Sequence, residues 1–185
     1  MGSEICIRDR IRIITAEVIK EVGNKLANGD LILEKEQTLS INISAIELLE
    51  IGFPNRFLRQ LEDSNINSEQ VYIEVTETAL ITNVGIAKRN IERLKNHGIK
   101  FAIDDFGTGY ASISMLRNIA VERIKLDRTF IENIQNEVDQ ALVKTVIWMS
   151  KALKVELVAE GIESEEQMNA LAGLGCKLGQ GLWLE

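Results

Sequence analysis

Two adjacent carboxylates end a short apolar run in the stretch "FAIDDFGTGY" at residues 101–110. Asp104 and Asp105 repel each other when both are ionised, unless a positive charge lies between them. Because carboxylate oxygens are the ligands that Mg²⁺ and Mn²⁺ prefer, the pair predicts a divalent metal site. Neighbouring residues of an extended strand point to opposite faces, so both carboxylates reach one site only if the strand breaks, and Gly107 and Gly109 permit that break.

Other apolar runs of the sequence also end in polar residues. They end at Asn42, Glu74, Lys125, Glu160 and Gln180. A carboxylate shared between two ions about 4 Å apart is the arrangement that hydrolyses phosphodiesters, and Lys125 could neutralise charge that develops on phosphorus. Each residue taken singly is more often a solvated charge at a strand end, and only their recurrence at successive runs indicates a site. The one histidine, His97, lies in a helix ending, so zinc is not expected.

Helical and strand-like segments alternate between these polar positions. The spacing predicts helices over residues 10–28, 53–64, 84–97, 138–153 and 164–175, and strands over 38–44, 70–77, 99–104, 123–127, 154–160 and 176–183. In the first helix we expect a buried line formed by Ile11, Ile14, Val18, Val22 and Leu26. In the long helix near the end we expect one formed by Val138, Leu142, Thr145, Met149 and Leu153.

Strands separated by helices indicate parallel pairing, so the predicted fold class is α/β. Polar residues at every carboxyl end favour a (β/α) barrel, where those ends form one rim, over a doubly wound sheet. No Gly-rich phosphate loop follows the first strand to support a dinucleotide-binding fold. Since a closed barrel has eight strands and about 250 residues, we expect an incomplete TIM-like barrel of about six parallel strands with helices outside.

The composition limits the class of protein further. The 185 residues carry a formal net charge of −7, which argues against a basic surface for nucleic-acid polymers. Cys6 and Cys176 match no metal-ligand spacing and predict no disulfide framework. The first residues mix charge with apolar side chains, unlike a signal peptide. We therefore expect a cytoplasmic domain without membrane contact of its own, in a parent protein that could be membrane anchored.

Six segments carry a resemblance to a known family. "SINIS", "IEVTE", "FAIDDFGTGYAS", "IKLD", "LVAEGIES" and "GQG" occur in the order and approximate spacing of EAL domains. These are bacterial phosphodiesterases that open cyclic-di-GMP to linear pGpG with Mg²⁺ or Mn²⁺. The chain resembles the third through eighth strands of that family's barrel, which implies the same fold, substrate and divalent ions, two of them in the site.

The resemblance implies a metal-binding and catalytic role for six residues. The implied metal ligands are Asn42, Glu74, Asp104, Asp105 and Glu160. Asp104 would bridge two ions. Lys125 would contact the attacking water or the phosphate, and with Glu160 and Asp105 it would form the catalytic group.

Three further residues receive a supporting role from the resemblance. Glu163 and Gln180 would lie beside substrate or water, and Glu77 would anchor the loop "DFGTGYAS". In the family that loop couples metal binding to the dimer interface. For Glu77 and Glu163, a carboxylate that only supports the site or faces solvent is an equal alternative.

One departure from the family affects the expected activity. The family's Glu-Ala-Leu motif on its second strand is absent, and the first 37 residues offer only "AEVIKEV" on a helix. We therefore expect residues 1–185 to be a single domain, truncated at its N-terminus and cut after its last strand, with impaired activity in an otherwise active parent.

Several other functions remain open from the sequence alone. A non-catalytic cyclic-di-GMP sensor and a protein-interaction or dimerisation module are the main alternatives to the enzyme. Open sheet edges predict a homodimer or self-association, and the parent is expected to carry an upstream sensory domain. Enolase-like chemistry uses similar strand ends and is excluded only by the resemblance.

Overall fold

The computed structural model describes residues 7–109, 116–117 and 119–184, which form two compact units. Unit 1 comprises Met1–Val75 and Ala79–Lys100, and unit 2 comprises Thr76–Thr78 and Phe101–Glu185. Each unit is described by itself.

A pair of parallel strands lies at the centre of unit 1. β1 (Leu39–Asn42) pairs with β2 (Val71–Thr76), and Asn42 lies opposite Glu74. The backbone N–H of Ile43 donates to the Glu74 carbonyl at 2.9 Å, which continues the pairing beyond β1. The parallel arrangement predicted for these two segments is confirmed.

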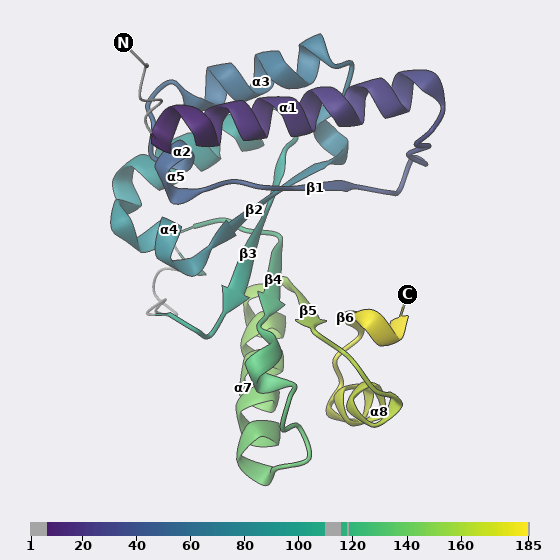
Figure 1. Ribbon diagram of the computed structural model, residues 1–185. Coiled ribbons are helices and arrows are strands. Elements are labelled where there is room, and N and C mark those ends of the chain that lie inside the picture. The colour runs from purple at the N-terminus through teal and green to yellow at the C-terminus, as the bar shows by residue number, and fades with distance from the viewer. Residues whose placement is uncertain (1–6, 110–115, 118, 185) are drawn as a thin grey trace. The chain divides into compact units, whose positions relative to one another are not determined.

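Helical segments make up most of the rest of unit 1. They are α1 (Ile7–Asn28), α2 (Ala45–Leu48), α3 (Phe53–Asp63) and α5 (Val84–Lys95), with the 3-10 turn η1 (Ser68–Gln70) and with α4 (Glu77–Thr82), whose first two residues belong to unit 2. Figure 1 shows α1 running beside α3. Pro54 lies in the first turn of α3, where its missing N–H costs nothing, as the sequence predicts.

The buried face of α1 differs from the predicted one. Ile14 and Val18 are exposed, whereas Thr15, Ile19 and Gly23 are buried. Apolar side chains follow two neighbouring lines along this helix, so their period predicts a helix without deciding which line packs. Contacts with α2 and α3 make that choice.

A charged cluster joins α1 to the segment between α2 and α3. The Glu50 carboxylate accepts hydrogen bonds from Arg12 Nη2 at 2.7 Å and from Arg56 Nη1 at 2.8 Å. Nearby, the Thr15 hydroxyl donates to the buried Glu47 carboxylate at 2.8 Å. Burial alone would raise the pKa of Glu50, but the hydrogen bonds from the two guanidinium groups outweigh it, so the pKa is lowered.

Four strands in chain order form the sheet of unit 2. They are β3 (Lys100–Phe106), whose first residue belongs to unit 1, β4 (Arg123–Leu126), β5 (Glu156–Glu160) and β6 (Leu178–Gln180). All adjacent pairs are parallel. The pairing of β3 with β4 changes register between Ile103 and Phe106, which marks a local irregularity.

The helices α7 (Glu137–Leu153) and α8 (Glu165–Leu174) lie where the sequence predicts them. The 3-10 turns η2 (Arg128–Phe130) and η3 (Leu182–Leu184) are not predicted, and η3 takes the end of the strand predicted over residues 176–183. Ser164 and Gln167 form a capping box that begins α8, as its sequence indicates. In α7 the predicted buried line is confirmed only at Met149: Val138 and Leu142 are exposed, and Val143 and Ile147 are buried.

None of the helices in the described ranges combines the length and the apolar character that a bilayer crossing requires.

Two helical glycines give opposite predictions for the same substitution. A Cβ on Gly23 of α1 would lie 2.7 Å from both Ser64 Cβ and the Ser64 carbonyl oxygen, whereas Gly173 of α8 has open space around it. We expect Gly23→Ala to lower the free energy of unfolding by about 1–3 kcal/mol through overpacking. Gly173→Ala should raise it by roughly 0.5–1 kcal/mol through helix propensity. Chemical denaturation of both variants measures the difference, and equal signs would contradict it.

The Glu50 cluster predicts a pH-dependent stability. Glu50→Gln leaves two arginines without their shared carboxylate, and we expect a loss of about 3 kcal/mol at neutral pH. A lowered folded-state pKa stabilises the fold above the ordinary glutamate value of about 4.3, and this contribution disappears as pH falls through the folded-state value. The difference in stability between the unmodified chain and Glu50→Gln should therefore disappear in acid. Glu21→Gln, at an exposed pair with Lys25, is the matched control and should leave the stability almost unchanged at every pH.

Candidate metal centre

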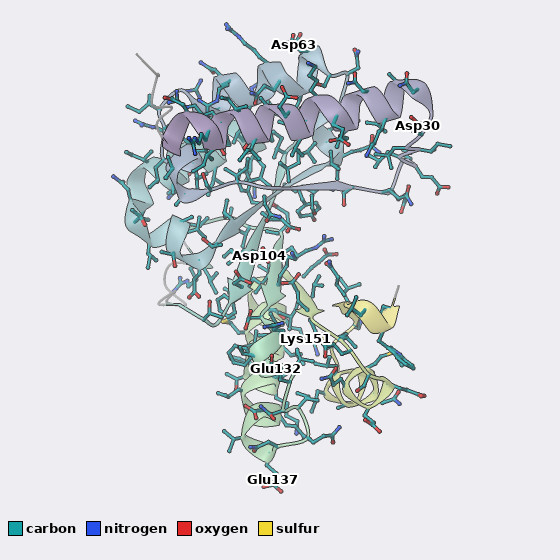
Figure 2. The ribbon with its side chains drawn as sticks, in the orientation of Figure 1. Asp30, Asp63, Asp104, Glu132, Glu137 and Lys151 are labelled. Carbon is teal, nitrogen blue, oxygen red and sulfur yellow. The ribbon has the colours of Figure 1, made fainter. Side chains whose placement is uncertain are left out.

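Three charged side chains of unit 2 meet near the carboxyl ends of β3, β4 and β5. Lys125 Nζ lies 3.1 Å from Asp104 Oδ1 and 2.8 Å from Glu160 Oε1. The lysine side chain is 9% exposed and the two carboxylates are 19% exposed each. The ammonium therefore offsets two partly buried negative charges that would otherwise repel each other. Figure 2 marks Asp104 on β3.

An unusual backbone conformation brings Asp105 to the same place. Asp105 has φ +52, a left-handed value that aspartate tolerates better than most residues. The register change between Ile103 and Phe106 falls at the same point. The predicted break in alternation is thus present, but it occurs at Asp105 itself, and Gly107 with φ +101 continues it.

The resulting carboxylate cluster fits a divalent cation. Asp104, Asp105 and Glu160 each offer an oxygen, and these atoms lie within 4.8 Å of one another. Asp104 Oδ1 is shielded from solvent and makes no well-directed hydrogen bond within the described residues, although it lies close to the Lys125 ammonium. Mg²⁺ and Mn²⁺ prefer oxygen ligands, and either ion would bind this buried acceptor together with the other carboxylate oxygens.

Burial and the neighbouring negative charges raise the pKa of two carboxylates in this cluster. Burial raises the pKa of Asp105, and the charges of Asp104 and Asp127 raise it further against the opposing effect of Lys125. Burial likewise raises the pKa of Glu160, and the hydrogen bond from Lys125 only partly opposes this rise. Both carboxylates would ionise more readily beside an added cation.

Glu77 contacts the loop that follows β3. Its carboxylate Oε2 accepts hydrogen bonds from the backbone N–H groups of Gly109 at 2.9 Å and Gly107 at 3.4 Å. The Glu77 residue is 3% exposed. This is the geometry that a loop anchor requires, and the remainder of the loop "DFGTGYAS", from Tyr110 onward, lies outside the described residues.

The two predicted substrate residues border the cluster through β5 and β6. Gln180 ends β6 directly opposite Glu160 in the strand pairing and is exposed. Glu163 lies in the turn before α8, where its backbone N–H donates to Gln167 Oε1 at 2.8 Å. Its side chain is exposed, so a solvated carboxylate remains the simpler description of Glu163.

The remaining predicted ligands belong to unit 1. Asn42 and Glu74 are opposite residues at the carboxyl ends of β1 and β2. Asn42 is exposed, and Glu74 is buried and has an interaction partner. The prediction that these two residues share a metal site with Asp104, Asp105 and Glu160 stays a prediction.

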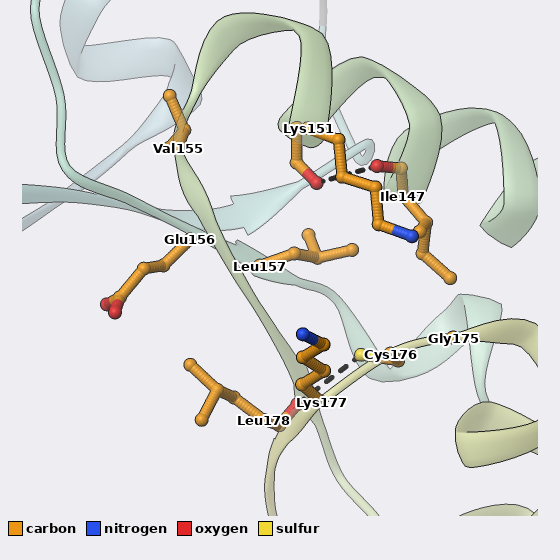
Figure 3. A pocket seen from close by; sticks show the side chains of 10 residues that line it. Ile147, Lys151, Val155, Glu156, Leu157, Gly175, Cys176, Lys177 and Leu178 are labelled. Atoms are coloured by element: carbon orange, nitrogen blue, oxygen red, sulfur yellow. Dashed lines mark hydrogen bonds between the residues drawn. The ribbon is translucent and has the colours of Figure 1, made fainter.

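A cavity of about 340 Å³ lies elsewhere in unit 2 and holds none of the predicted residues. Figure 3 shows it between α7, the first residues of β5 and the loop before β6, with Lys151, Leu157 and Cys176 in its lining. Burial raises the pKa of the Cys176 thiol, which donates to the Leu178 carbonyl at 3.4 Å. The cavity is at the opposite end of the strands from the carboxylates.

No role was predicted for Arg128 and Phe130 of η2 from the sequence. Their neighbours in space are Gly161 and Gly107, which follow the carboxylate positions of other strands. Contacts of this kind leave no local pattern in the sequence that could have identified them.

The chain matches the model of a known protein family over most of its length. The family model described as EAL domain matches residues 8–185, and the chain belongs to this family. The predicted fold class is confirmed as the incomplete TIM-like barrel of EAL domains.

The most informative relatives are two curated proteins and one solved structure. "Cyclic di-GMP phosphodiesterase PdeF" of Escherichia coli is 36% identical over 77% of this chain, and "Cyclic di-GMP phosphodiesterase RocR" of Pseudomonas aeruginosa is 34% identical over 77%. The Klebsiella pneumoniae BlrP1 complex with manganese and cy-diGMP is 30% identical, with a TM-score of 0.84 over 96% of this chain and 45% of that chain. The chain spans only 19% of PdeF and 37% of RocR.

Removing one negative or one positive charge from the cluster should change the stability in opposite directions. Asp105→Asn deletes a disfavoured charge and keeps a side chain that tolerates positive φ, so we expect the thermal midpoint of the metal-free chain to rise by about 2 °C. Lys125→Met leaves Asp104 and Glu160 without their cation and should lower the midpoint by roughly 5 °C.

Calorimetry with EDTA present measures both midpoints. In excess Mn²⁺ the midpoint should rise for the unmodified chain and rise less for Asp105→Asn. Shifts of the same sign for the two variants without metal would contradict the electrostatic description of this cluster.

Proposed function

We propose that this chain is part of a metal-dependent phosphodiesterase that hydrolyses cyclic-di-GMP to linear pGpG. The observation that carries the proposal is the cluster of Asp104, Asp105 and Glu160 around Lys125 in a member of the EAL family. The printed functions of PdeF and RocR, and the ligands in the BlrP1 structure, support the choice of substrate.

The proposed cofactors are two Mg²⁺ or Mn²⁺ ions. Asp104, Asp105 and Glu160 would hold them, with Asp104 shared and with Asn42 and Glu74 as further ligands. Bound there, such ions would supply Lewis-acid activation of water and stabilisation of the leaving oxygen in phosphodiester hydrolysis. The all-oxygen donor set and the buried Asp104 oxygen support this assignment.

The chain's own residues would orient the substrate and balance its charge. Lys125 carries a positive charge on an ammonium held by two carboxylates, and we assign it to the attacking water or to a phosphate oxygen, where negative charge develops. Glu163 and Gln180 would contact substrate or water at the β5 and β6 ends, and Glu77 would keep the loop after β3 in place.

We also propose the cellular context that the sequence suggests. The parent would be cytoplasmic or carry its catalytic part in the cytoplasm, with an upstream sensory domain, and the free thiol of Cys176 and the greater length of the relatives support this. A homodimer or self-association is proposed because Leu182 and Trp183, which follow β6, are exposed apolar side chains.

Hydrolysis of cyclic-di-GMP tests the proposal directly. We expect the parent protein to form pGpG with Mg²⁺ or Mn²⁺, as resolved by chromatography, and the 185-residue chain to be much less active because it lacks the family's Glu-Ala-Leu motif. In the parent, Glu160→Gln should reduce kcat/KM by roughly 10²-fold or more. Glu132→Gln, at an exposed carboxylate of the same unit (Figure 2), is the matched control and should leave it unchanged.

Two results would contradict the proposed enzyme. The first is the absence of hydrolysis by the parent protein with either metal. Tight metal-independent binding of the nucleotide in calorimetry would instead support the sensor.

A further inference from the structure

The short turn η2 begins at Arg128, two residues after β4 ends at Leu126 and three residues after Lys125. Asp127 caps it, because its carboxylate accepts a hydrogen bond from the backbone N–H of Thr129 at 2.9 Å. The backbone N–H of Ile131 closes the turn on the Arg128 carbonyl at 2.8 Å. Local hydrogen bonds therefore give η2 a defined shape.

Two glycines that follow proposed metal ligands pack against this turn. Gly107 comes two residues after Asp105, and Gly161 comes directly after Glu160. A Cβ on Gly107 would clash with Phe130 Cε2, and one on Gly161 would lie 2.5 Å from Arg128 Cβ. Both glycines have positive φ, +101 and +73. The backbone after β3 and the backbone after β5 are thus each in close contact with the same turn.

The loop after β3 is held from two sides. Glu77 accepts the backbone N–H groups of Gly107 and Gly109, and the Phe130 ring covers Gly107. The hydroxyl of Thr108 donates to the Asp105 carbonyl at 2.9 Å, which joins the loop to the residue in the left-handed conformation. The left-handed backbone at Asp105 is therefore tied to a loop that both Glu77 and Phe130 contact.

We propose that η2 is a spacer that sets the distance between the carboxylates of β3 and β5, with Phe130 as a positioning residue for Asp105. Phe130 contacts the backbone after β3 at Gly107, and Arg128 Cβ contacts the backbone after β5 at Gly161. The inference rests on the proposed function only for the identity of the metal, because the contacts of η2 with Gly107 and Gly161 are present in the chain without a metal.

A set of variants at η2 tests the spacer in the 185-residue chain. Phe130→Ala removes the ring from Gly107, and we expect the Mn²⁺ affinity in calorimetry to fall roughly 10–100-fold, the range seen when supports of metal ligands are lost. Phe130→Leu keeps most of the contact and should stay within about 3-fold of the unmodified chain. Glu132→Gln, at an exposed carboxylate just after η2, is the matched control and should bind Mn²⁺ unchanged.

A second readout does not depend on metal. Hydrogen exchange of the Gly107 and Gly109 amides, which donate to Glu77, should accelerate about 10-fold or more in Phe130→Ala and little in Phe130→Leu. An amide in helix α8 provides the internal reference, because a merely destabilised chain would accelerate there as well. If Phe130→Ala does not fold, Gly161→Ala tests the other contact and should weaken Mn²⁺ binding, with partial recovery when Arg128→Gly is added.

The outcomes separate this inference from the proposed function. Unchanged exchange at both glycine amides together with unchanged Mn²⁺ affinity in Phe130→Ala would overturn the spacer. Local acceleration of exchange supports it even if the unmodified chain binds no Mn²⁺, a result that would count against the phosphodiesterase instead. Equal acceleration at the loop and in α8 would also overturn it, because it would reduce Phe130 to a general packing residue.

Discussion

The repulsion among Asp104, Asp105 and Glu160 is the constraint on which the structure of unit 2 depends. Like charges gathered in a partly buried position cost free energy unless a cation accompanies them. Lys125 provides one positive charge within 3.1 Å of two of these carboxylates. Because three acids face one ammonium, the cluster keeps an excess of negative charge, and this excess is what makes it a suitable place for divalent ions.

The same charges require a rigid backbone. Asp105 has a left-handed φ at a change of strand register, and glycines with positive φ follow both Asp105 and Glu160. Each conformation costs free energy or entropy and persists only where neighbours enforce it. Glu77 and the turn η2 are the neighbours in contact with these positions. A strained site supported by buried contacts is the usual compromise between binding a ligand and folding stably.

Unit 1 contains a charged cluster in which arginines accompany the carboxylates. Glu50 is one carboxylate shared by Arg12 and Arg56, and their hydrogen bonds more than compensate for its burial. Arg56 also lies 3.6 Å from Glu47 and Arg12 lies 3.8 Å from Asp9, so each arginine accompanies two carboxylates there, and the arginines remain partly exposed to water. This cluster therefore joins helices and stabilises the fold, whereas the acid-rich cluster of unit 2 is left to be completed by a ligand.

The sequence by itself determined the α/β class, the order of strands and helices, and the polar residues at the strand ends, because periodicity, caps and turn residues are local properties. It did not determine which apolar line of α1 or α7 is buried, since Ile14 and Val18 satisfy the helical period as well as Thr15 and Ile19 do. Only the tertiary structure placed Lys125 between Asp104 and Glu160 and brought η2 against Gly107 and Gly161. These contacts join residues distant in the chain, and their energies depend on distance and burial, which sequence spacing does not contain.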